Sequence, residues 1–170
     1  SHVHFQRFER GNYSEQLKVI GDTTETGTSV KFKADSEIFE DTVYDYETLH
    51  TRMREQAFLN AGLQITITDA RPGMEQSETM RYEGGIREFV KYLNKNKEVL
   101  FPEPIYVEGS KGDIEIEVAL QYINDYTEQI NSYCNRINLV DGGTLVTGFK
   151  TALTRVLNSY ARELGYLKID

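Results

Sequence analysis

The sequence is poor in the residues that stabilise secreted and membrane-spanning proteins. Its 170 residues include 1 Cys, 3 Pro and no Trp. A single cysteine cannot form an internal disulfide, so Cys134 indicates a reducing compartment, and we predict a buried thiol there. No apolar run approaches the roughly 18 residues that a membrane helix needs. These absences favour a cytoplasmic protein and a chain without a membrane-spanning segment.

An excess of basic residues is also missing. The chain has 19 Lys and Arg against 27 Asp and Glu, which gives a formal net charge of −8. An autonomous nucleic-acid-binding domain normally has a basic excess or a basic stripe. We therefore expect DNA contact only from a local basic surface within a larger assembly. The three histidines show no metal-ligand spacing, and no glycine-rich phosphate loop with its lysine is present. The patterns thus predict no catalytic residue and no metal site.

Hydrophobic periodicity predicts an α+β fold. Alternating segments indicate strands at about 3–10, 17–20, 27–33, 63–68, 78–82, 105–107, 114–120 and 129–137. Apolar residues at helical spacing indicate helices at about 46–60, 86–94 and 147–164. The linker-like stretch Asn94–Glu98 and the prolines that follow indicate a boundary, so we predict two parts, 1–97 and 98–170.

The predicted strand 27–33 places a hydroxyl in an unusual position. Thr28, Val30 and Phe32 would share one face, and the intervening polar residues the other. We expect the Thr28 hydroxyl to lie on the buried face, where it would need a hydrogen-bond partner.

Two long stretches resemble a known family. Tyr82–Lys97 reads YEGGIREFVKYLNKNK, and Asp141–Arg162 contains DGGT, GFK, ALTR and NSYAR in order. Both resemble the B subunits of bacterial DNA gyrase, and the match runs from Phe5 to Lys168. The first stretch is similar to the junction behind the ATP-binding domain, and the second is similar to the start of the transducer domain.

The resemblance implies an architecture and an activity. The family consists of type IIA topoisomerases whose B subunit starts with a GHKL-type ATPase domain, an α/β sandwich. A transducer domain with a ribosomal-protein-like βαβ fold follows. The expected cofactors are ATP and Mg. The expected partners are DNA, a gyrase A subunit, a second B subunit in an ATP-dependent dimer, and coumarin-type inhibitors at the nucleotide pocket. ATP binding and hydrolysis would drive DNA strand passage and negative supercoiling.

The resemblance also assigns roles to residues of this chain. Thr28 matches the threonine that helps to hold adenine, and Val30 matches an apolar residue that lines the adenine and coumarin pocket. Gly27 lies beside both. Lys150 matches a basic position that faces DNA in a central cavity, and we expect it to be exposed because it lies off the apolar stripe of its helix.

Two residues depart from the family pattern, and several family residues are not in the chain. Leu145 stands where histidine is usual, and Gln56 stands where leucine is usual. The catalytic glutamate, the magnesium-binding asparagine and the lid of the family are expected upstream, and the phosphate-contacting lysine downstream. We therefore expect the isolated chain to be catalytically inactive. The alternatives are a B subunit of topoisomerase IV and a non-catalytic interaction module on the same scaffold.

Overall fold

The computed structural model describes residues 1–167, so Lys168, where the resemblance ends, lies outside the described residues. The chain forms two compact units, Ser1–Asp45 and Tyr46–Asp170, and each is described by itself. The boundary expected between residues 97 and 98 falls inside the second unit and stays a prediction.

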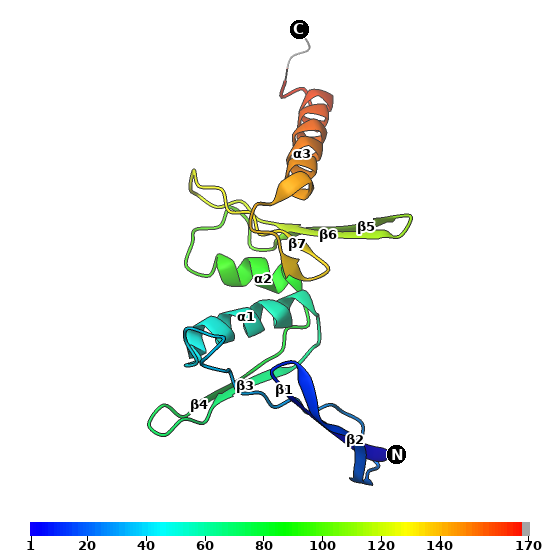
Figure 1. Cartoon of the computed structure of the whole chain (residues 1–170). Helices are drawn as coiled ribbons and strands as arrows, with labels where there is room; N and C mark the ends of the chain where they lie inside the picture. The colour runs from blue at the N-terminus through cyan, green and yellow to red at the C-terminus, as the bar shows by residue number, and fades with distance from the viewer. Residues whose placement is uncertain (168–170) are drawn as a thin grey trace. The chain divides into compact units, whose positions relative to one another are not determined.

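The first unit is built on one antiparallel hairpin of β1 (His2–Glu9) and β2 (Asn12–Asp22) (Figure 1). Its two-residue turn, Arg10 and Gly11, has φ values of 48° and 81°. Such a turn needs positive φ at both positions, which glycine adopts without steric cost. Both predicted strands are confirmed, and the second is longer than expected.

The predicted strand at 27–33 is wrong. This segment is irregular, and Val30 and Phe32 are 80% and 76% exposed. An alternating sequence forms a strand only where a neighbouring strand pairs with its backbone. No strand within residues 1–167 pairs with this segment. The face with Thr28 and Val30, which we expected to be buried, is therefore exposed.

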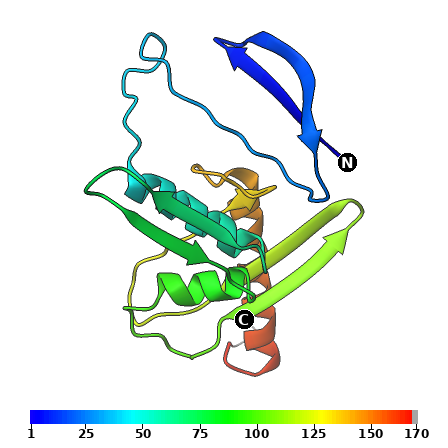
Figure 2. The same cartoon turned by 90° about the horizontal axis from the view of Figure 1, so that it is seen from below.

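The second unit begins with a helix, a hairpin and a second helix. These are α1 (Tyr46–Leu59), β3 (Ile65–Asp69), β4 (Gln76–Met80) and α2 (Ile86–Leu93). The hairpin is in register from the Ile65–Met80 pair onward. Figure 1 shows α1 between this hairpin and α2, and Figure 2 shows the hairpin in front of α1. The two helices and two strands predicted from periodicity in this region are therefore confirmed.

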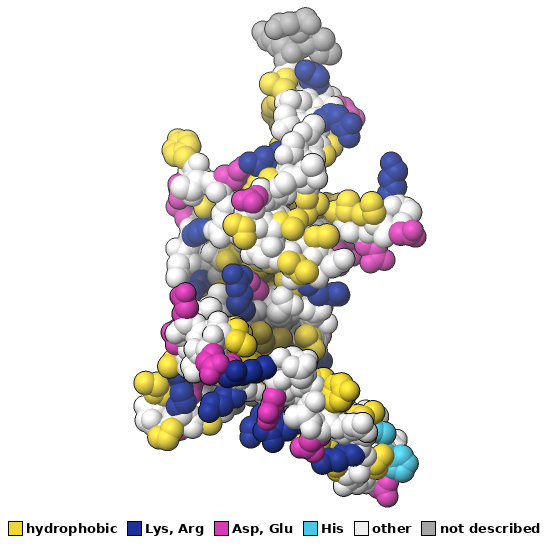
Figure 3. All heavy atoms as spheres, viewed as in Figure 1, with side chains coloured by type: hydrophobic (Ala, Val, Ile, Leu, Met, Phe, Trp, Pro, Cys, Tyr) yellow, Lys and Arg dark blue, Asp and Glu magenta, His cyan; other side chains and the backbone are white. Residues whose placement is uncertain are grey.

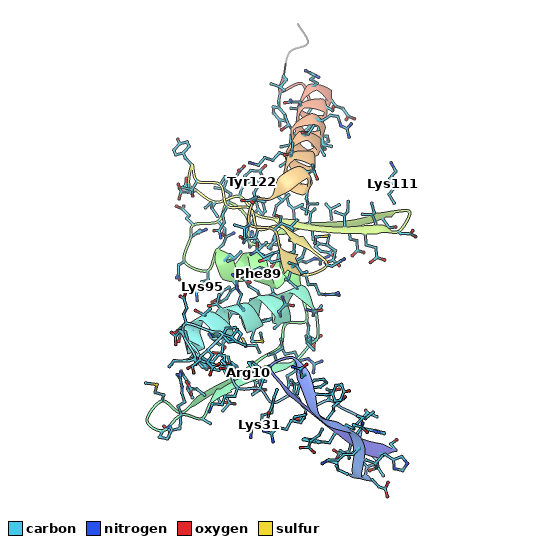
Figure 4. The ribbon with its side chains drawn as sticks, in the orientation of Figure 1. Arg10, Lys31, Phe89, Lys95, Lys111 and Tyr122 are labelled. Carbon is cyan, nitrogen blue, oxygen red and sulfur yellow. The ribbon has the colours of Figure 1, made fainter. Side chains whose placement is uncertain are left out.

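The core of the chain lies between α1, β4 and α2. Its buried apolar residues are Ala57, Phe58, Met80 and Phe89. The Phe58 ring lies in stacked orientation, 3.6 Å between centroids from Tyr82 and 4.9 Å from Phe89. Figure 4 labels Phe89 on α2. Fully burying a phenylalanine stabilises a fold by about 1.5–3 kcal/mol, so this stack anchors the unit.

A second hairpin follows α2 and has two unlike faces. It pairs β5 (Ile105–Lys111) with β6 (Ile114–Leu120), so the first strand extends beyond the predicted 105–107. One face carries exposed apolar side chains, which are Ile105, Val107, Ile114 and Ile116. The space-filling view shows apolar side chains along this hairpin (Figure 3).

The chain continues through a very short hairpin. The weak strand predicted at 129–137 is reduced to β7 (Tyr133–Cys134) and β8 (Ile137–Asn138). The prediction of a buried Cys134 thiol is wrong, because the residue borders the turn of this hairpin and is exposed.

The last element is the long helix α3 (Gly143–Glu163), which begins four residues before the expected Thr147. None of its residues is buried. No helix within the described part of the chain is both long and apolar enough to cross a membrane.

Candidate functional site

The residues predicted to contact a nucleotide lie in the irregular segment of the first unit. Gly27, Thr28 and Val30 are all exposed. A Cβ atom built on Gly27 would meet nothing within 4 Å, so packing within the described chain does not require glycine there. The structure therefore places the three residues together on an open stretch of backbone. It does not enclose them in a pocket.

Charged contacts fix the end of this segment to the first hairpin. The Arg10 side chain bonds to Asp35 and Glu37, each at 2.8 Å. These contacts, with Glu37 first, raise the pKa of Arg10 above its ordinary value. Figure 4 labels Arg10 in the β1–β2 turn and Lys31 in the segment. Asp35 and Glu37, which follow Lys31 in the sequence, thus tie the irregular segment to the β1–β2 turn.

Lys150 is exposed on α3, as predicted. Its Nζ atom lies 2.5 Å from a carboxylate oxygen of Glu128. Arg155 and Arg162 are also exposed on α3 and lie seven residues apart. That spacing is about two helical turns, so the two guanidinium groups lie on one side of the helix. The helix therefore carries three cations, one of which is already paired.

The part of the chain that the structure describes holds no cluster of metal-ligating side chains. Residues 1–167 contain no group of three or more His, Cys, Asp and Glu side chains that could hold a metal ion. Magnesium at nucleotide sites is usually bound through one or two carboxylates together with water and substrate phosphates. The magnesium expected from the family therefore stays a prediction.

A polar network in the core was missed by sequence reasoning. His50 and Arg54 on α1 meet Glu78 on β4 and Tyr92 on α2. The Arg54 Nη1 atom donates to the Tyr92 hydroxyl at 2.7 Å, and Nη2 donates to Glu78 at 3.2 Å. His50 is 7% exposed. The network therefore joins three elements across the edge of the core.

One imidazole nitrogen in this network faces both a donor and an acceptor. His50 Nε2 lies 2.9 Å from Arg54 Nη2 and 2.8 Å from Glu78 Oε2. The nitrogen accepts from Arg54 when it is unprotonated and donates to Glu78 when it carries hydrogen, so it satisfies one contact at a time. The hydrogen bond from Arg54, followed by that from His50, lowers the pKa of Glu78.

The sequence contains a signal for this network. His50 and Arg54 are spaced i, i+4, so they lie on one face of α1 beside the apolar stripe of that helix. Polar side chains next to a buried stripe need partners. The partners could not be named in advance, because Glu78 and Tyr92 come from elements whose packing the sequence does not specify.

The C-terminal half of the chain matches a known protein family. The family model for DNA gyrase B covers residues 85–170, just over half of the chain. The chain belongs to the DNA gyrase B family. The resemblance inferred from the junction and transducer motifs is thereby confirmed.

Curated relatives extend the similarity to almost the whole chain. The DNA gyrase B protein of Clostridium acetobutylicum is 53% identical over 168 residues, which is 98% of this chain and 26% of that protein. The Bacillus mycoides relative is 51% identical over 98% of this chain and 41% of its own length. The chain thus spans about a quarter to two fifths of these relatives.

Solved structures confirm the α+β fold class. The 43K ATPase domain of Thermus thermophilus gyrase B, in complex with an aminocoumarin, has a TM-score of 0.84 and 36% identity. The similarity covers 99% of this chain and 46% of that domain. The gyrase B protein of Myxococcus xanthus has a TM-score of 0.80 at 23% identity, which supports the fold alone.

Proposed function

We propose that the natural polypeptide containing this chain is the ATPase subunit of a DNA gyrase. It uses ATP binding and hydrolysis to drive DNA strand passage and negative supercoiling. The proposal rests on the sequence identity of 53% to a gyrase B protein over 98% of the chain. The structural similarity to a gyrase B ATPase domain supports it. The A subunit, a second B subunit and DNA are the partners that this function requires.

Within that subunit, this chain supplies part of the machinery. Gly27, Thr28 and Val30 form one wall of the nucleotide pocket, and Lys150 faces DNA from α3. Their exposure supports both roles, because a side chain can contact a ligand only if it is not buried against the rest of the chain. The catalytic base, the metal ligands and the phosphate contacts come from other parts of the subunit, so the isolated chain is inactive.

The wall formed by Gly27, Thr28 and Val30 also indicates which class of inhibitor binds the pocket. The Thermus thermophilus neighbour was solved with an aminocoumarin. An apolar side chain such as Val30, 80% exposed, offers a surface for a flat, largely apolar ligand. We therefore assign coumarin-type inhibitors to the wall that contains Thr28 and Val30.

Isothermal titration calorimetry tests whether nucleotide binding needs residues outside this chain. The isolated chain should show no heat of binding with a non-hydrolysable ATP analogue, whereas the natural polypeptide should bind it. Micromolar affinity in the isolated chain would contradict the claim that the remaining pocket residues are essential.

A supercoiling assay tests the identity of the subunit. Combined with a gyrase A subunit, the natural polypeptide should introduce negative supercoils into relaxed plasmid when ATP is present. Decatenation without supercoiling would instead identify a topoisomerase IV protein. Absence of any ATP-dependent topological change would favour a non-catalytic interaction module.

A further inference from the structure

Residues 1–167 contain three two-residue hairpin turns, and two of them differ in the residue at the second position. The β1–β2 turn has Arg10 followed by Gly11, with glycine at the second position. The β7–β8 turn has Asn135 and Arg136, with φ values of 48° and 67°. Glycine is the favoured second residue of such a turn, and a residue with a bulky side chain is strained there. The β7–β8 hairpin therefore forms against a local conformational preference.

A contact from α1 meets that strained turn. The Nε2 atom of Gln56 donates a hydrogen bond of 3.2 Å to the backbone carbonyl of Arg136, eighty positions away in the sequence. Two-residue strands provide few ladder bonds of their own. The position of this short hairpin thus depends on its contacts with other elements of the chain.

Neighbouring residues show that the hairpin is docked on α1 and α2. The Tyr133 ring lies 6.5 Å from the Phe89 ring of the core. Burial, and next the charge of Glu55 on α1, raise the pKa of Tyr133 to about 12. An apolar contact by Tyr133 and a polar contact to Arg136 therefore act on the same small hairpin.

The hairpin leads directly into α3. Ser132 is 8% exposed and its hydroxyl donates to the Leu139 carbonyl at 3.2 Å, while the Leu139 amide returns a bond of 2.8 Å. The Gly142 amide then donates to the Leu139 carbonyl at 3.0 Å, immediately before α3 begins at Gly143. A shift of the hairpin would consequently move the first turn of α3.

We propose that Gln56 is a positioning residue that fixes the β7–β8 hairpin, and with it the start of α3, to α1. A hydrogen-bond donor is needed, because the group it meets is a backbone carbonyl. An apolar side chain of the same length would leave that carbonyl without this donor. If the proposed function holds, this contact sets the orientation of the Lys150 helix relative to the ATPase-domain part of the subunit.

Backbone amide exchange in the natural polypeptide tests this role without ATP or DNA. Gln56→Leu should accelerate exchange of the Leu139 and Gly142 amides about fivefold, the factor equivalent to one hydrogen bond of ordinary net strength. Exchange in the β3–β4 hairpin should not change. Gln56→Lys, which keeps a donor of sufficient reach, should restore most of the protection. Gln64→Leu, an exposed glutamine outside the contact, serves as the matched control.

The outcomes separate this proposal from the proposed function. Unchanged Leu139 and Gly142 exchange in Gln56→Leu would overturn the positioning role, whatever the supercoiling assay shows. Equal acceleration across β3–β4 would also overturn it, because that result describes general loss of stability. Local acceleration with rescue by Gln56→Lys would support it even if supercoiling were absent.

Discussion

The two units of the chain differ sharply in how they bury their side chains. In Ser1–Asp45 no side chain is buried, and Phe8 on the first hairpin is 60% exposed. In the second unit Phe58 is 1% exposed, within a stack of aromatic rings. Both regions contain strongly alternating or periodic sequence. The difference shows that an apolar pattern produces a core only where packing partners are present.

The predicted contact residues lie where packing is least. Thr28 and Val30 belong to the unit without buried side chains, and Lys150 lies on a helix without any. A partly buried polar network instead joins α1, β4 and α2. We conclude that α1, β4 and α2 form the scaffold of the second unit, and that the predicted contact residues lie outside it.

The largest expected effect comes from the aromatic stack. Phe58→Ala should lower the free energy of unfolding of the second unit by about 3–5 kcal/mol, because it removes a buried ring and leaves a cavity. Phe8→Ala in the first unit should change it by less than about 0.5 kcal/mol. Chemical denaturation followed by circular dichroism measures both. Equal effects would erase the contrast between the units.

The partly buried polar network of His50, Arg54, Glu78 and Tyr92 should give the next largest effect. Arg54→Met removes the donor to the Tyr92 hydroxyl and one of the two partners of the half-exposed Glu78, so we expect a loss of about 1 kcal/mol. Arg52→Met, two residues away on α1, removes only an exposed ion pair with Glu55 and should cost less than about 0.5 kcal/mol. The same denaturation experiment compares them, and an equal loss would contradict the scaffold role of the network.

The network should also make stability depend on pH. The hydrogen bond from Arg54 holds the pKa of Glu78 below its ordinary value of 4.5. A lowered carboxyl pKa contributes stability above its unfolded value, and this is lost as pH falls through the folded pKa. The melting temperature of the wild type should therefore exceed that of Glu78→Gln at pH 7, with the gap narrowing below about pH 4.5. A gap that widens in acid would contradict this account.

A smaller effect is expected at Thr28 and only with ligand present. In the natural polypeptide, Thr28→Ala should weaken ATP-analogue or aminocoumarin binding about threefold to tenfold, as expected for one lost hydrogen bond. Its melting temperature without ligand should not change, because Thr28 is exposed. Thr24→Ala, another exposed threonine of the first unit, is the control. Unchanged affinity in Thr28→Ala with intact folding would remove Thr28 from the pocket.

The smallest effect on stability is expected at Lys150. Removing its exposed ion pair with Glu128 by Lys150→Ala should cost at most about 1 kcal/mol. If the residue meets a phosphate, the dependence of DNA affinity on salt should become shallower by about 0.9 in logarithmic slope. Filter binding or fluorescence anisotropy over a range of salt concentrations measures this slope. An unchanged slope would mean that Lys150 does not contact DNA and only forms its ion pair with Glu128.

Much of the second unit could be predicted from the sequence. Periodicity located α1, α2 and the β3–β4 hairpin, because each has a local pattern that matches its buried face. The turn residues Pro72 and Gly73 also marked the loop of that hairpin. The family was predicted from ordered motifs and not from periodicity, which reached only an α+β fold.

The failures of sequence reasoning have a shared physical cause. The segment 27–33 alternates as a strand does, yet a strand needs a neighbour that the segment itself does not encode. Cys134 is exposed because it is the last residue of the two-residue strand β7 and borders the hairpin turn. The contact between Gln56 and Arg136 links residues far apart in the sequence, and no local pattern announces it.

Amide exchange of residues 27–33 in the natural polypeptide, with and without a non-hydrolysable ATP analogue, tests the central claim most directly. If this segment is a wall of the nucleotide pocket, the analogue should slow its exchange, while the β5–β6 hairpin serves as an internal reference that does not respond. Exchange at 27–33 that is identical with and without saturating analogue, in a polypeptide that still hydrolyses ATP, would contradict the account.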